Sequence, residues 1–189
     1  MSFLQHPAFQ SLVLPLLLAT ASMVLLRLAG TRWTALGAAL GLVIALTVWP
    51  GFDWPASSRA QTLPWIALAG LLAAALAIGL NAPGTKALTR GAGLLATALV
   101  TVLAVALAVW AALGGSLLLA QLALMVGSVA GVAGLWAWRS ATITPAALAP
   151  LVLAGLVIAF AQGSLALSSP EAAGDAAERD DPYYTPQWK

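Results

Sequence analysis

The sequence has no cysteine and very little charge. Without cysteine, the chain of 189 residues has no disulfide, no thiolate metal site and no cysteine nucleophile. Charged residues make up only 7% of it, against about 25% in ordinary soluble domains. Hydrophobic residues make up 61%, so too few charges remain to build a water-facing surface. We therefore expect the chain to fold within a membrane.

Acidic residues and histidine are also scarce. Asp53 is one of the six acids, and the other five lie in the last nineteen positions: Glu171, Asp175, Glu178, Asp180 and Asp181. Ionisable groups inside a membrane mark ion paths and proton relays, yet none lies well inside a long apolar run. The single histidine, His6, has no second ligand at metal-binding spacing, and no phosphate-binding loop or catalytic triad is present. The sequence predicts neither an enzyme nor a metal or cofactor site.

What the sequence does contain is six long apolar runs. A hydrocarbon core of about 30 Å is crossed by roughly 20 helical residues, each rising about 1.5 Å. Membrane barrels show alternating segments instead, so continuous runs favour helices. We predict an all-α, polytopic transmembrane helix bundle with short loops and spans near 9–29, 33–50, 64–82, 91–113, 116–138 and 146–167. The first run is expected to be a retained span, because the segment before it has no Lys or Arg.

The basic residues predict an orientation, because Lys and Arg accumulate in cytoplasmic loops. With the N-terminus outside, only Arg59 falls in an outside loop, and the inside loops contain Arg27, Arg32, Lys86, Arg90 and Arg139. Tryptophan prefers the headgroup level, and six tryptophans lie near predicted span ends: Trp33, Trp49, Trp65, Trp110, Trp136 and Trp138. Both termini are therefore predicted on the extracytoplasmic side, in a membrane such as the bacterial inner membrane. The dispersed basic residues form no nucleic-acid patch.

The last segment, 168–189, differs from the rest of the chain. It is acidic and lacks apolar periodicity, which predicts a disordered or extended tail outside the membrane. Its end contains Tyr183, Tyr184 and Trp188 among prolines that favour an extended backbone. These aromatic side chains are candidates for docking on a membrane-protein partner, since aromatic residues often anchor interfaces. The alternative is that they lie on the membrane surface.

Two glutamines are the polar side chains in the spans that the backbone least readily satisfies. Gln121 and Gln162 share a predicted depth of about 7–8 Å below the outer face. They are expected either to hydrogen-bond across a helix interface or to line an outward-facing pocket with Trp110.

Small residues recur at helix-packing spacing. Gly37–Gly41 and Gly127–Gly131 both fit the GxxxG motif, for which we expect packing inside the bundle more than contact with another subunit. The run Leu68–Leu71 recurs as Leu153–Leu156, which suggests two three-span halves of inverted topology.

Three classes of function follow from these patterns. The favoured class is a non-enzymatic accessory, assembly or scaffold component of a membrane complex, in contact with the lipid bilayer and with a partner through the tail. The second is a small permease for a neutral or apolar solute, suggested by Pro15, Pro150 and the glutamines. The third, an intramembrane enzyme acting on lipid, lacks a nucleophile, a base and a metal site in the sequence.

Overall fold

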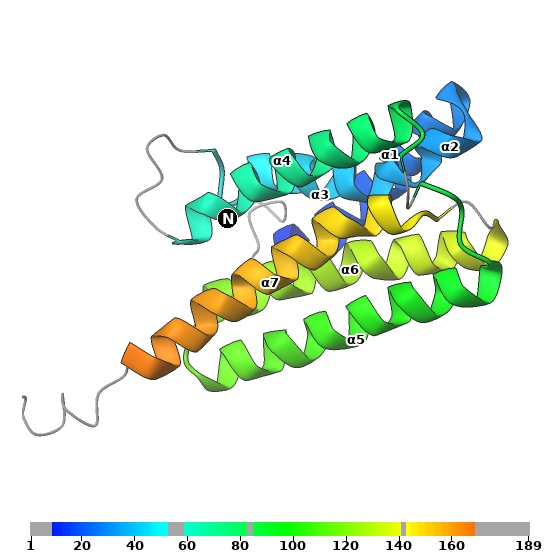
Figure 1. Ribbon diagram of the computed structural model, residues 1–189. Coiled ribbons are helices and arrows are strands. Elements are labelled where there is room, and N and C mark those ends of the chain that lie inside the picture. The colour runs from blue at the N-terminus through cyan, green and yellow to red at the C-terminus, as the bar shows by residue number, and fades with distance from the viewer. Residues whose placement is uncertain (1–8, 53–58, 83–84, 141–142, 169–189) are drawn as a thin grey trace, which may run out of the picture.

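The protein is an all-helical transmembrane bundle. The computed structural model describes residues 9–52, 59–82, 85–140 and 143–168 (Figure 1). Helix accounts for 86% of these described residues, and they contain no strand. Four helices are long and apolar enough to cross a membrane, and two shorter apolar helices accompany them. The predicted fold class is confirmed.

Within the described ranges, six helical segments follow one another, and each overlaps one predicted span. Their bounds are Phe9–Val13, a π-helical turn that continues into α1 (Leu14–Ala29); α2 (Thr31–Thr34) and α3 (Leu36–Val48), separated only by Ala35; α4 (Arg59–Gly79); α5 (Arg90–Leu113); α6 (Leu117–Arg139); and α7 (Pro145–Ser168). The short helices α1 and α3 therefore reach span length, about 27–32 Å, with the turns that precede them.

Three of the described prolines, Pro15, Pro64 and Pro150, lie within helices. The π-helical turn ends two residues before Pro15, which lacks the backbone N–H that an α-helical bond would need. Pro64 lies inside α4, which begins five residues before the predicted span, at Arg59. Pro150 lies inside α7, and that helix is unbroken from Pro145 onward. None of these three prolines ends its helix, whereas Pro50 follows the last residue of α3, Val48, by two positions.

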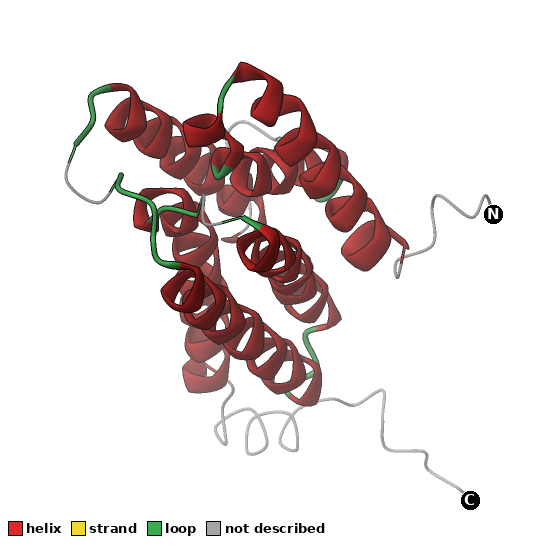
Figure 2. Ribbon diagram, turned by 90° about the vertical axis from the view of Figure 1, so that its right-hand side faces the viewer, coloured by secondary structure: helices red, strands yellow, loops and turns green. Residues whose placement is uncertain are grey.

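The helices associate mainly in three pairs: α5 with α6, α1 with α3, and α4 with α7. The first two pairs join neighbours in the chain, whereas α4 and α7 are far apart in sequence and lie side by side (Figure 1). Figure 2 shows that the described elements are all helices, joined by loops. The helix α6 also contacts α1, α3 and α7, and more of it is buried than of any other long helix. The predicted recurrence, Leu68–Leu71 and Leu153–Leu156, falls on the paired helices α4 and α7.

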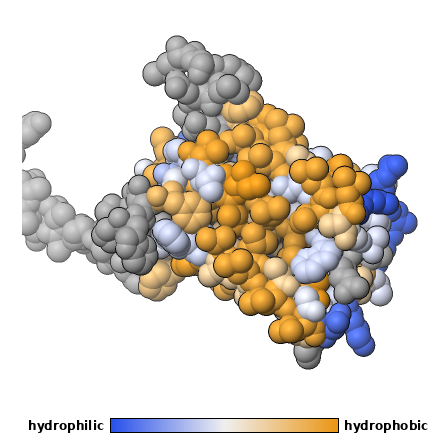
Figure 3. All heavy atoms as spheres, turned by 90° about the horizontal axis from the view of Figure 1, so that it is seen from above, coloured by the Kyte–Doolittle hydropathy of each residue, from blue (hydrophilic) through white to orange (hydrophobic). Residues whose placement is uncertain are grey.

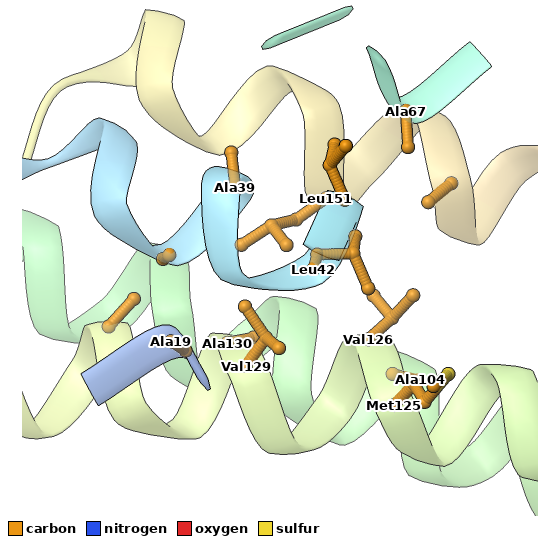
Figure 4. Packing of buried hydrophobic residues seen from close by; sticks show 14 of the residues in the cluster. Ala19, Ala39, Leu42, Ala67, Ala104, Met125, Val126, Val129, Ala130 and Leu151 are labelled. Atoms are coloured by element: carbon orange, nitrogen blue, oxygen red, sulfur yellow. The ribbon is translucent and has the colours of Figure 1, made fainter. Parts of the chain in front are cut away.

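The core lies where α3, α6 and α7 meet. Leu42, Val129 and Leu151 have no exposed surface, and Figure 4 shows them pointing toward one another between the helices. The helices α1 and α3 approach closely at the first GxxxG motif. A Cβ atom built on Gly37 would lie 2.5 Å from the Met23 nitrogen, and one built on Gly41 would lie 2.5 Å from the Ala19 nitrogen. Only glycine permits this approach, so this motif packs inside the bundle.

Charged side chains gather at one end of the apolar body. This basic end, defined by Arg27, Lys86, Arg90 and Arg139, combines the end of α1, the start of α5 and the end of α6. Figure 3 shows hydrophilic surface concentrated at that end, with apolar surface along the bundle between the ends. Tryptophans lie near both ends: Trp33, Trp136 and Trp138 at the basic end, and Trp49, Trp65 and Trp110 at the opposite end.

Candidate functional site

The predicted glutamine pair is not joined by a hydrogen bond. Gln162, on α7, is only 2% exposed and lies against the turn between α5 and α6, where a Cβ atom added at Gly114 would collide with its Nε2. Its Oε1 atom is buried without a hydrogen-bond partner in the described part of the chain. Gln121, on α6, is half-buried, and no hydrogen bond links it to Gln162 in the described ranges. The structure therefore places Gln162 as a packing residue between α7 and the α5–α6 turn.

Trp110 lines an apolar groove of about 470 Å³ between α5 and α7, which we call the α5–α7 groove. Val126 of α6 forms its floor, and its walls are aliphatic side chains and Gly155. Neither glutamine lines this groove. Gln162 lies three residues beyond Ala159, which does line the groove. The groove therefore suits an apolar chain or a helix face rather than a polar solute.

A larger groove of about 950 Å³ runs between α1 and α5 across the face of α6. We call it the α1–α5 groove. Most of its length is lined by aliphatic side chains and by the second GxxxG motif, Gly127–Gly131. A Cβ atom added at Gly131 would meet nothing within 4 Å, whereas one added at Gly127 would lie 3.4 Å from the Ala104 Cβ of α5, so only the Gly131 end of the motif is open. Toward the basic end the lining changes to Arg90, Trp136, Trp138 and Arg139.

Hydroxyl groups add little polarity to the α1–α5 groove, because each donates to a carbonyl of its own helix. Thr20 Oγ1 donates to the Leu16 carbonyl at 2.8 Å, and Thr101 Oγ1 donates to the Thr97 carbonyl at 2.9 Å. Ser128 Oγ donates in the same way to a carbonyl one turn back. The middle of the groove is therefore effectively apolar.

Arg90 of α5 and Arg139 of α6 line the basic end of this groove, and Arg27 of α1 contacts Trp136 there. Arg90 Nε donates to the Trp138 carbonyl, which holds its guanidinium beside the end of α6. The Arg27 guanidinium carbon lies 5.8 Å from the centroid of the Trp136 ring, a cation–π contact. The Trp136 indole N–H is buried and has no hydrogen-bond partner in the described residues. The site thus combines cations with an unsatisfied donor.

The loops at this end are held together by the backbone. The Leu88 N–H donates to the Ile143 carbonyl at 2.8 Å, which joins the α4–α5 loop to the α6–α7 loop. Ile143 is buried, and the Thr144 hydroxyl accepts from the Ala147 N–H at 3.2 Å to begin α7. The helix ends that contain Arg90 and Arg139 therefore adjoin two loops that are hydrogen-bonded to each other.

Sequence reasoning missed this site, because it interpreted the arginines only as determinants of orientation. A usable signal existed: α5 and α6 form a tight hairpin, so residues that begin α5 and end α6 must meet. Among the described residues, no group of three His, Cys, Asp or Glu is placed to hold a metal. Outside the described residues lie the predicted docking side chains Tyr183, Tyr184 and Trp188.

No protein-family model, curated protein or solved structure matches this chain.

Proposed function

We propose that this multi-pass membrane protein is a non-enzymatic accessory, assembly or scaffold component of a membrane complex. We further propose that it resides in the bacterial inner membrane, with the basic end in the cytoplasm and both termini on the other side. The observation that carries the proposal is the α5–α7 groove, an incompletely packed apolar seam on the lipid-facing side of the bundle.

The lining of the α5–α7 groove fits a transmembrane helix of a partner subunit. Its rim is exposed: Leu103 is 59% exposed, Leu156 is 61% and Trp110 is 46%. Its interior contains small residues, and a Cβ atom added at Gly155 would meet nothing within 4 Å. Helices in membranes associate by close van der Waals packing at small residues, since lipid chains are as apolar as leucine side chains. The groove offers this kind of surface without a charged side chain.

The proposal is tested by purifying the tagged full chain from its host in mild detergent. We expect a stoichiometric membrane-protein partner whose retention is lost in Gly155→Leu, because the new side chain fills the groove. The matched control is Ala73→Leu, the same class of enlargement at an exposed position of α4 that does not line this groove. Deleting residues 183–189 tests the contribution of the tail separately. A wild-type chain that elutes without a partner, or equal retention by both leucine variants, would contradict the proposal.

The unpartnered Gln162 carbonyl favours a second candidate, a permease for a neutral solute. Against it, side chains without exposed surface, such as Leu42 and Leu151, fill the middle of the bundle. Osmotic swelling of proteoliposomes in glycerol or urea distinguishes the two candidates. Swelling no faster than that of protein-free liposomes eliminates the permease, whereas faster swelling that is lost in Gln162→Leu would support it.

A further inference from the structure

The α1–α5 groove joins an apolar trough to a group of cations. The trough is complementary to an acyl chain, and the cations are complementary to an anionic headgroup. Along α6 its lining extends from Leu124 to Arg139, a rise of about 22 Å. One leaflet of the hydrocarbon core is about 15 Å thick. An acyl chain can therefore lie along the groove with its headgroup at the basic end.

The cations of the basic end have no acidic partners nearby in the chain. The loops at this end, residues 30–35, 80–89 and 140–144, contain no Asp or Glu. The described residues contain no Asp or Glu, because the six acids of the sequence are Asp53 and five residues beyond Ser168. No carboxylate of the described residues therefore neutralises Arg90 or Arg139, and basic pockets at membrane surfaces attract anionic headgroups.

The geometry of the arginines suits a phosphate. A guanidinium has five N–H donors in a planar fork that matches phosphate oxygens. Arg90 uses Nε on the Trp138 carbonyl, which orients the fork and leaves its terminal nitrogens as donors. Arg139 lines the same end, and the Trp136 indole N–H adds a donor without a partner in the described residues.

We propose that the α1–α5 groove binds one anionic phospholipid, with its phosphate at Arg90 and Arg139 and an acyl chain over Gly127–Gly131. The acyl chain contributes little selectivity, because the surrounding lipid is equally apolar. Selectivity comes from the headgroup, and each arginine near an anionic surface changes affinity about fivefold.

Native mass spectrometry of the full chain in mild detergent tests the proposal, with phosphatidylglycerol and phosphatidylcholine offered at equal concentration. We expect preferential retention of phosphatidylglycerol by the wild type and about fivefold less in Arg139→Gln. Lys86→Gln is the control, because it removes a cation from the same end that does not line the groove. Equal retention of the two lipids by the wild type would overturn the proposal.

A second variant separates lipid binding from folding. Gly131→Leu keeps every arginine and extends into open space, so the bundle should fold, while the groove is filled. We expect it to lose phosphatidylglycerol while retaining the wild-type circular dichroism spectrum. Undiminished lipid retention by this variant would refute the site. A lipid-free dimer that Gly131→Leu dissociates would also refute it, by showing that a second copy occupies the groove.

Discussion

Replacing Gly41 by alanine should separate α1 from α3 and destabilise the bundle. The new Cβ atom would lie 2.5 Å from the Ala19 nitrogen and 2.9 Å from the Leu18 carbonyl carbon, both in the backbone. Ordinary contacts between heavy atoms lie near 3.5–4.0 Å, so the helices must move apart by about 1 Å. Overpacking of this kind costs about 1–3 kcal/mol. Backbone atoms cannot rotate away as a flexible side chain can.

A matched control isolates this packing cost. Gly163→Ala makes the same change in α7, where a Cβ atom would meet nothing within 4 Å. Both variants gain helix propensity, about 1 kcal/mol, so the difference between them reports packing. Unfolding in mixed micelles, titrated with dodecyl sulfate and followed by tryptophan fluorescence, measures it. We expect Gly41→Ala to be less stable than Gly163→Ala by about 1–3 kcal/mol. A difference below about 0.5 kcal/mol would refute the close α1–α3 approach.

Two further substitutions test the polar contacts by the same titration. Gln162→Met should leave stability unchanged or raise it by about 1–3 kcal/mol, because it removes a buried carbonyl without a hydrogen-bond partner in the described residues. A loss of stability would show that the Gln162 amide makes a stabilising bond. Arg27→Gln should cost about 0.5–1 kcal/mol through loss of the cation–π contact with Trp136. The same cost in a Trp136→Leu background would show that the effect of Arg27 does not depend on the ring.

The helical segments followed from the sequence because uninterrupted apolar runs leave few alternatives in a membrane. Which helix faces meet did not follow, since a helix that is apolar on all sides has no preferred face. The two GxxxG motifs looked equivalent, yet Gly41 packs on α1 and Gly131 lines an open groove. Depth was also an incomplete guide, because Gln121 and Gln162 share a predicted level but are not hydrogen-bonded to each other. The direction in which a side chain points depends on how the helices are arranged.

The proximity of Arg90 and Arg139 could have been predicted from the sequence. The short turn Gly114–Ser116 makes α5 and α6 antiparallel neighbours of nearly equal length, so their distant ends must adjoin. The contribution of Arg27 depends on α1 running alongside α6, which no sequence pattern indicates. That placement became evident only from the structure.

The alternation of the helices across the membrane is the central claim, and cysteine labelling tests it most directly because the natural chain has no cysteine. Thr31→Cys and Ala87→Cys lie at the basic end, whereas Ser116→Cys lies in the α5–α6 turn at the opposite end. In spheroplasts treated with a membrane-impermeant maleimide, we expect labelling of Ser116→Cys alone. The other two variants should react only after permeabilisation. Equal labelling of all three in intact spheroplasts would contradict the account.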